Sequence, residues 1–238
     1  MADSVVTEEV RGRALVATIA HGKANALSSD VLVALGAALD KVEAAGENGP
    51  GALVVTGTPG MLSGGFDLAV MRSGPKEAGR LVTEGGTLFT RFFSSPAPVV
   101  VACTGHAIAA GALLLLGADY RVGATGDFRI GLIETQLGMV LPRWATEFSE
   151  ERLSRRHFQQ ATVGARIYDP ETAVDAGFLD ATVEPGAVLD AALAEAERWA
   201  ALPASAYAGQ VRLNRGERLA KLDAALEADR NLLFQGPN

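Results

Sequence analysis

A run without any charged side chain, from Phe92 to Ala118, constrains the fold of this chain more than any other feature. A membrane-spanning helix needs about 20 predominantly apolar residues, but prolines and glycines interrupt this run at several points. Residues 99–102 are mostly valines, which is typical of a buried strand. We therefore predict a buried strand, a glycine turn and then a short buried helix over residues 109–116, in place of a membrane span.

The rest of the chain alternates between strand and helix patterns. Apolar runs predict strands over residues 14–19 and 52–56. Leucines recur at helical spacing between them, after a capping residue Ser28 or Ser29 and before a closing Gly46. Further predicted elements are a helix over 78–92, short strands over 120–122 and 128–130, a helix from Asp169-Pro170 to Gly177, a strand over 178–183 and helical chain from residue 187 onward. This alternation predicts a single α/β domain with a helical C-terminal part.

The amino-acid composition and net charge limit the classes of protein to which this chain can belong. The 238 residues are 48% hydrophobic and 21% charged, which suits a folded domain with a sizeable core. A formal net charge of -7 disfavours nucleic acid as a partner, because nucleic-acid binding depends on neutralising phosphates. An anionic ligand would have to meet local Lys or Arg side chains or helix N-termini.

The cysteine content and the first residues of the chain indicate the compartment of the protein. Cys103 is the only cysteine, which excludes an intramolecular disulfide and fits a reducing compartment, and we expect it in the core. The first residues lack the basic and apolar segments of a signal peptide, so we predict a cytoplasmic protein. Residues 233–237, Leu-Phe-Gln-Gly-Pro, resemble an engineered protease recognition site; whether engineered or native, they carry no functional interpretation.

Two turns of small residues and one carboxylate are candidates for chemistry. The turns are residues 63–65 and 105–111, and the carboxylate is Glu134, which lies among apolar and amide side chains. Small residues let the backbone approach a ligand closely, so these turns can offer N–H groups to a developing oxyanion. A carboxylate beside them can move a proton. Together they suit enolate chemistry on a thioester.

Four motifs follow one another along the chain: Lys-Ala-Asn-Ala-Leu at 23–27, Leu-Ser-Gly-Gly-Phe-Asp-Leu at 62–68, the small-residue loop at 105–111, and Ile-Glu-Thr-Gln-Leu-Gly at 133–138. In these motifs and in their order the chain resembles the crotonase, or enoyl-CoA hydratase/isomerase, superfamily, and the resemblance covers residues 13–184. The resemblance implies an α/β fold built as a spiral of repeated β-β-α units, with an acyl-CoA thioester as the ligand and a place in fatty acid metabolism.

The resemblance also implies an organisation and an assembly. We expect a crotonase-like core domain over residues 1–184 and a C-terminal helical region over 185–238, packed on the core or on a neighbouring subunit. Family members form trimers or dimers of trimers, so a homotrimer or hexamer is expected. Coenzyme A is part of the substrate in this family, so we expect no separate cofactor. No spacing of His, Cys, Asp or Glu predicts a metal site.

Site residues are carried over from the family motif by motif. The two oxyanion N–H groups would come from Gly64 and Ala110, and a one-residue slip of the second to Gly111 stays open. The loop at 23–27 resembles the one that wraps the adenine of coenzyme A. The implied substrate-binding positions are Lys23, Ala24, Ala26, Leu27, Gly65, Phe66, Asp67, Gly111 and Leu113. For Asp67 we predict a helix-capping role rather than chemistry, and for His106 a packing role.

The acid–base residues decide which reaction the resemblance favours. Family hydratases use two glutamates, and the first of these positions is Leu113 here, while the second is retained as Glu134. One carboxylate suffices to remove the C2 proton of a 3-enoyl-CoA and return it at C4. The segment 130–138, with Pro142 and Trp144 beyond it, looks like the mitochondrial 3,2-trans-enoyl-CoA isomerase branch, in which the matching glutamate is the sole acid/base. Isomerisation is therefore the predicted reaction.

Two alternatives stay open. One is another crotonase reaction, such as hydration or thioester hydrolysis, performed by Glu134 and a water. The other is a non-catalytic acyl-CoA-binding protein, which the retained Glu134 and both oxyanion turns disfavour. Leu113 is the feature that separates isomerisation from hydration. The acyl chain length does not follow from the sequence; the side chains that could line a tail pocket are Phe66, Met71, Phe89 and Trp144.

Overall fold

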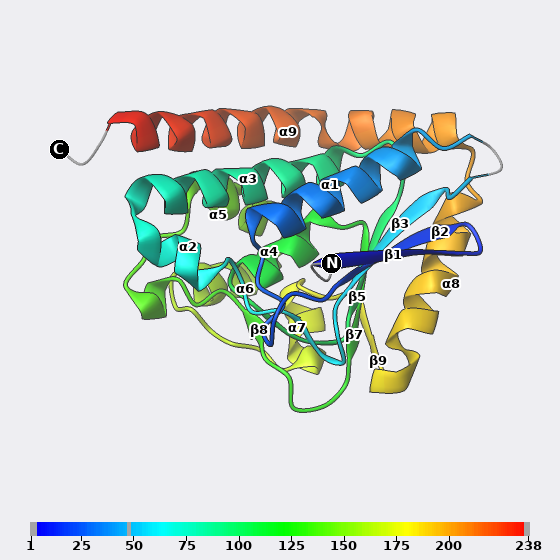
Figure 1. The fold of residues 1–238 in the computed structure, drawn as a ribbon, viewed down its shortest axis with the longest axis horizontal. Coiled ribbons are helices and arrows are strands. Elements are labelled where there is room, and N and C mark those ends of the chain that lie inside the picture. The colour runs from blue at the N-terminus through cyan, green and yellow to red at the C-terminus, as the bar shows by residue number, and fades with distance from the viewer. Residues whose placement is uncertain (1–3, 47–48, 236–238) are drawn as a thin grey trace.

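Two sheets organise the computed structural model, which describes residues 4–46 and 49–235 (Figure 1). The larger sheet has the order β1-β2-β3-β5-β7-β9, in which β1 is antiparallel to β2 and the other pairs are parallel. Its strands are β1 (Val6–Arg11), β2 (Ala14–Ile19), β3 (Ala52–Thr56), β5 (Val99–Cys103), β7 (Tyr120–Ala124) and β9 (Ala181–Val183). The smaller sheet is parallel, with β4 (Gly60–Ser63), β6 (Gly105–Ile108) and β8 (Ile130–Gly131) in the order β4-β6-β8.

The chain passes through the two sheets as a repeat. Each of β3, β5 and β7 in the larger sheet is followed by a strand of the smaller sheet and then by helix. These helices are α2 (Leu68–Ser73) with α3 (Pro75–Ser94), then α4 (Ala110–Gly117), then α5 (Arg143–Arg152). The predicted α/β fold with repeated β-β-α units is confirmed.

Helices cover both faces of the larger sheet, so its central strands are buried on both sides, as in other parallel sheets. The main core lies between one face and α1 (Ser29–Glu43), α3, α4 and α5. A second, smaller core lies between the other face and α8 (Val188–Ala200), where Val188, Ala192 and Ala196 pack. The remaining helices of the described residues, apart from the last, are α6 (Arg155–Thr162), α7 (Pro170–Ala176) and the 3-10 turns η1 (Thr135–Leu137) and η2 (Pro185–Ala187).

The last helix, α9 (Ala204–Gln235), lies along α3 and α5 of the chain's own core (Figure 1). A buried carboxylate anchors its first half: Asp119 accepts hydrogen bonds from Tyr207 Oη at 3.0 Å and Arg215 Nη2 at 2.5 Å. Near the other end, Asp229 Oδ2 accepts from the backbone N–H of Trp144 at 3.2 Å, at the start of α5. The backbone of α9 includes residues 233–235 of the Leu-Phe-Gln-Gly-Pro segment, and residues 236–238 lie outside the described residues.

Several helix ends follow the predicted capping. Ser28 accepts from the backbone N–H of Val31 at the start of α1. Asp169 caps α7 with Pro170 at its first position, and Gly177 closes that helix in the left-handed conformation with φ +95°. Asp67 accepts from Ala69 and Val70 and so caps α2, as predicted.

Three predicted elements differ in the structure. The glycine turn after β5 contains the strand β6, and the glycine at its start reflects close packing, since a Cβ at Gly105 would lie 2.1 Å from the carbonyl carbon of Gly60. The strand expected over 128–130 is β8, displaced to 130–131. The strand expected over 178–183 is confined to 181–183, because Phe178 and Leu179 both donate to the Ala173 carbonyl and close α7.

Among the helices within residues 4–46 and 49–235, none combines the length and apolar character that crossing a membrane requires.

Candidate active site

The predicted catalytic residues follow the carboxyl ends of the three parallel strands of the smaller sheet. Gly64 directly follows β4, Ala110 lies two residues after β6, and Glu134 lies three residues after β8. The register holds these ends level, since Ser63 pairs with Ala107 on one side and Ile108 pairs with Gly131 on the other. In parallel sheets, loops at the carboxyl ends of the strands are the usual place for ligands.

The two small-residue turns touch through their glycines. A Cβ at Gly111 would lie 2.3 Å from the Ser63 carbonyl oxygen, and a Cβ at Gly65, whose φ is +108°, would lie 3.2 Å from the Ile108 carbonyl oxygen. Neither position has room for a side chain without moving backbone atoms. Glycine therefore brings the start of α4 directly against the turn that contains Gly64.

Backbone N–H groups at this junction differ in availability. Ala110 is the first residue of α4, and its N–H donates to no backbone carbonyl of the described residues, as expected at a helix start. The Gly64 N–H donates to the Ala24 carbonyl at 2.8 Å. A ligand oxygen would thus find the Ala110 donor open and would compete with the Ala24 carbonyl for the Gly64 donor.

The backbone before the open donor is strained. Ala109 has φ +52° and ψ −122°, a combination of backbone angles that residues other than glycine rarely adopt. Its own N–H donates to the Gly131 carbonyl at 2.9 Å, which ties this turn to the end of β8. Strain of this kind costs roughly 1–3 kcal/mol and collects at functional sites.

Replacing Ala109 by Gly is expected to raise the free energy of unfolding by about 1 kcal/mol, since relief of strain outweighs the extra freedom that glycine gives the unfolded chain. Because the hydrogen bond to Gly131 uses backbone atoms, the site should keep its shape and its activity. Chemical denaturation of the variant and the wild type measures the difference. A lower free energy of unfolding would contradict the assignment of strain.

Glu134 is half-buried, and its Oε2 is enclosed without a hydrogen-bond partner among the described residues. Burial raises the pKa of this carboxyl, and hydrogen bonds from backbone N–H groups offset the rise only in part. The main chain at Glu134 is fixed by its carbonyl, which accepts from Leu137 and Met139 at 3.0 and 2.9 Å. A carboxylate with these properties is suited to accept and return a proton.

The other groups in these loops do not provide a second acid or base. The Asp67 carboxylate accepts two backbone N–H groups of α2, and Leu113 is 2% exposed in the main core. His106 accepts from the backbone N–H of Arg129 at 3.0 Å and packs edge-on against Phe128, in line with the predicted packing role. The Cys103 thiol is fully buried, which raises its pKa to about 12 and makes it unreactive.

The segment at 23–27 lies against the Gly64 turn. Leu27 is buried and exchanges backbone hydrogen bonds with this turn, donating to the Gly65 carbonyl and accepting from Asp67. Ala26 is half-buried, while Lys23 and Ala24 are exposed. The structure thus brings the predicted adenine loop and the predicted oxyanion turn together.

Asn25 is a site residue that sequence reasoning did not single out. It is fully buried with φ +46°, and its amide nitrogen donates to Thr58 Oγ1 and to the Met61 carbonyl at 3.0 and 2.8 Å. Its amide oxygen accepts from the His21 N–H. Asn25 therefore holds the loop at 23–27 onto β4 and the connection that precedes it. The available signal was its residue type, because Asn tolerates the left-handed conformation better than most residues.

Two of the four candidate tail-pocket side chains, Phe66 and Trp144, pack against α3, and a third, Phe89, lies on α3 itself. The Phe66 ring fills the space beside Gly85, where a Cβ would lie 2.5 Å from the ring. Trp144 fills the neighbouring space beside Gly86 and meets Phe89 edge-on, with ring centroids 6.0 Å apart. The glycines of α3 therefore make the space that the Phe66 and Trp144 rings occupy. Met71 packs against the main core from α2.

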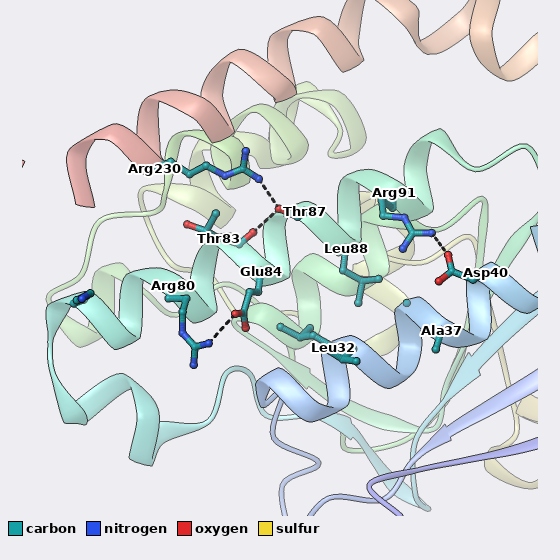
Figure 2. A pocket seen from close by; sticks show the side chains of 13 residues that line it. Leu32, Ala37, Asp40, Arg80, Thr83, Glu84, Thr87, Leu88, Arg91 and Arg230 are labelled. Atoms are coloured by element: carbon teal, nitrogen blue, oxygen red, sulfur yellow. Dashed lines mark hydrogen bonds and ion pairs between the residues drawn. The ribbon is translucent and has the colours of Figure 1, made fainter. Parts of the chain in front are cut away.

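A cavity of about 920 Å³ lies elsewhere, over α1, α3 and the end of α9 (Figure 2). None of the predicted site residues lines it. Figure 2 shows that several of its charged side chains bind neighbours in the cavity wall: Arg80 pairs with Glu84 at 3.3 Å, Arg91 pairs with Asp40 at 2.5 Å, and Arg230 donates to Thr87. We assign the chemistry to the strand ends and not to this cavity. No group of three His, Cys, Asp or Glu side chains within the described residues is arranged to hold a metal ion.

Known proteins share this architecture. A family model described as enoyl-CoA hydratase/isomerase matches residues 12–237. Human mitochondrial enoyl-CoA delta isomerase 1 is 33% identical over 184 residues, which cover 75% of this chain and 60% of that protein's length. A solved enoyl-CoA hydratase/isomerase family protein from Pseudomonas syringae matches with a TM-score of 0.92 and 41% identity, over 96% of this chain and 98% of the other.

A relative named for the other reaction is similarly close. A solved enoyl-CoA hydratase from Mycobacterium ulcerans matches with a TM-score of 0.89 and 37% identity, over 97% of this chain and 99% of the other. Both kinds of name thus occur among the similar proteins. Since the family model covers nearly the whole sequence, the chain belongs to the enoyl-CoA hydratase/isomerase family.

Proposed function

We propose that this protein is an isomerase that converts 3-enoyl-CoA into 2-trans-enoyl-CoA, with Glu134 as its only acid/base. The observation that carries the proposal is the Glu134 carboxylate itself, which is half-buried, with one enclosed oxygen that has no hydrogen-bond partner among the described residues, in the loop that follows β8 as Ala110 follows β6. The 33% identity to a human enoyl-CoA delta isomerase supports the same reaction. Assembly as a homotrimer or hexamer and a cytoplasmic location stay predictions.

The proposed reaction moves one proton and one double bond. The thioester oxygen of the substrate accepts hydrogen bonds from the N–H groups of Ala110 and Gly64, the latter in place of the Ala24 carbonyl. Glu134 removes a proton from C2, and the electron pair forms an enolate whose negative oxygen these donors stabilise. The protonated Glu134 then delivers the proton to C4 as the double bond shifts from C3–C4 to C2–C3. The carboxylate is regenerated, and the reaction consumes no other reactant.

Hydration would require a second acid–base group, in addition to Glu134, that the described residues of the site do not supply. Adding water across C2–C3 needs a group that activates the water and a group that protonates C2. Leu113, at the position where family hydratases have a glutamate, is buried in the main core and carries no polar group. A hydratase reaction would therefore have to use Glu134 alone for both roles.

The direct test is an assay of the purified protein with 3-enoyl-CoA and, separately, with 2-enoyl-CoA over several chain lengths. Conversion of the 3-enoyl substrate with little hydration of the 2-enoyl substrate is the expected result. Predominant hydration would contradict the proposal and would mean that Glu134 serves as both acid and base for water. Tight acyl-CoA binding without turnover would identify a binding protein.

The pH dependence of isomerisation is expected to follow the ionisation of the Glu134 carboxyl. Only ionised Glu134 can remove the C2 proton, and burial raises its pKa, so kcat/KM should fall on acidification with a midpoint above the value of about 4.3 for a free glutamate. Initial rates at 3-enoyl-CoA concentrations well below KM, measured over the range in which the protein stays folded, give the profile. An acid limb at or below pH 4.3 would be inconsistent with a buried base.

A further inference from the structure

The loop that carries Glu134 has little apolar packing of its own. After Glu134 the chain makes the single 3-10 turn η1, none of whose residues is buried. Its last residue and those that follow are open to solvent, with exposed fractions of 55% for Leu137, 40% for Met139 and 92% for Val140. Hydrophobic burial therefore does little to hold this segment, and its position depends on hydrogen bonds.

Two side chains next to Glu134 supply such hydrogen bonds, and both reach the same neighbouring segment. Gln136 Nε2 donates to the Ala165 carbonyl at 2.7 Å. Thr135 Oγ1 donates to the Thr162 carbonyl at 3.2 Å. Thr162 is the last residue of α6, where helix carbonyls lack partners within the helix. The bonds thus join the catalytic loop to the end of α6 and the residues that follow it.

The accepting segment is itself well fixed. Tyr168, three residues after Ala165, is 1% exposed and exchanges two backbone hydrogen bonds of 2.9 Å with Ile130 at the start of β8. Ala165 lies in the left-handed conformation with φ +46°. The carbonyl that accepts from Gln136 therefore belongs to a segment paired with the strand that leads into the catalytic loop.

We infer that Gln136, assisted by Thr135, is a positioning residue that holds the Glu134 carboxylate against the reacting carbons of the substrate. The inference deepens the proposed isomerase function and rests on it. Gln136 makes no contact with the reacting atoms in this role; it acts through the backbone of its neighbour. A displacement of about 1 Å at a reacting group can cost about 100-fold in rate, so a loop held by two hydrogen bonds is sensitive to losing one.

Two substitutions at one position separate the hydrogen bond from the size of the side chain. Gln136→Met has a similar length but no donor, while Gln136→Lys keeps a donor that can reach the Ala165 carbonyl. We expect Gln136→Met to lower kcat by about 10- to 100-fold with 3-enoyl-CoA while KM stays within about threefold. Gln136→Lys should recover at least half of the lost activity on a logarithmic scale.

Control variants test whether the effect belongs to this site. Gln210→Met removes a similar exposed amide hydrogen bond, from Gln210 to Asn214 in α9, and should leave kcat unchanged. If Gln136→Met does not fold, Thr135→Val and Thr135→Ser test the second bond in the same way, with loss of kcat expected only for the variant without a hydroxyl. Thermal unfolding of each variant confirms that the folded protein is being compared.

The outcomes distinguish this inference from the proposed function. If Glu134→Gln abolishes turnover but Gln136→Met keeps kcat within about twofold of the wild type, the positioning role is wrong and the isomerase mechanism stands. Equal loss in Gln136→Met and Gln136→Lys, or a loss confined to KM, would also overturn the positioning role. If Glu134→Gln itself retains turnover, the proposed mechanism fails first.

Discussion

Replacing Glu134 by Gln is expected to lower kcat with 3-enoyl-CoA by about 10⁴-fold while leaving KM nearly unchanged. A general acid/base contributes about 10²–10⁴ in rate, and the upper end applies because the same carboxylate both removes and returns the proton. Glutamine has the same size, and the groups proposed to bind the thioester are backbone N–H groups of other residues. Steady-state kinetics and acyl-CoA binding by titration measure the two effects separately.

The stability of this variant provides a second expectation with a definite sign. Burial raises the pKa of Glu134 in the folded protein, so the folded state binds this proton more tightly than the unfolded state. The group's favourable contribution is complete below its unfolded pKa and is lost as pH rises through the raised folded pKa. At a pH above the folded pKa the wild type therefore contains a destabilising buried carboxylate, and Glu134→Gln, which stays neutral, should show an equal or higher Tm there.

Glu150→Gln is the matched control, because Glu150 is an exposed glutamate on α5, outside the three site loops. Its kcat and Tm should equal those of the wild type. Retained turnover in Glu134→Gln would remove Glu134 from the mechanism. If Glu134→Gln had a lower Tm than the wild type in that pH range, a partner would be stabilising the Glu134 carboxylate, and burial would not be destabilising it.

The parts of the fold with strong local patterns were predictable. The strands β2 and β3 have the predicted bounds, since β-branched and apolar runs bury both faces. The strands β4, β6 and β8 were missed or misplaced because they have only two to four residues and contain glycine. Polar helices such as α6, which buries only Ala161 and Thr162, contain too few apolar residues for a helix to be recognised from them.

The repeated β-β-α unit could not be detected as a period in the sequence, for a related reason. The three β-β-α units begin with β3, β5 and β7 at residues 52, 99 and 120, so no fixed period connects them. They are equivalent in topology and not in length, because different numbers of helical residues follow each strand pair. A period search detects equal spacing, whereas this fold repeats only the order of sheets and helices.

The site shows a similar division. The family resemblance pointed to Gly64, Ala110 and Glu134, and the sheet register puts the three loops that carry them at one edge of the smaller sheet. The pairing of the Gly64 N–H with the Ala24 carbonyl and the support of Glu134 by the Ala165 segment were not predictable. Both involve backbone carbonyls, whose direction depends on conformation and leaves no trace in residue type.

Replacing Gly111 by Ala is expected to lower kcat by about 10²–10³-fold, the cost of losing one oxyanion donor. The new Cβ would lie 2.3 Å from the Ser63 carbonyl oxygen and 2.9 Å from its carbon, so the backbone before Gly64 must move away from α4. Gly111 does not have a left-handed φ, so the effect comes from this contact and not from backbone strain. The N–H groups of Gly64 and Ala110 would then no longer have the spacing that the proposed mechanism requires for binding one thioester oxygen.

Gly105→Ala separates this effect from general damage to the smaller sheet. Its Cβ would lie 2.1 Å from the Gly60 carbonyl carbon, which forces β4 and β6 apart at the ends opposite the site. Both variants should unfold at a lower temperature, but only Gly111→Ala should lose kcat per folded molecule, as measured by activity after correction for the folded fraction. An equal loss of kcat in the two variants would mean that the sheet as a whole, and not the spacing of the two donors, limits the reaction.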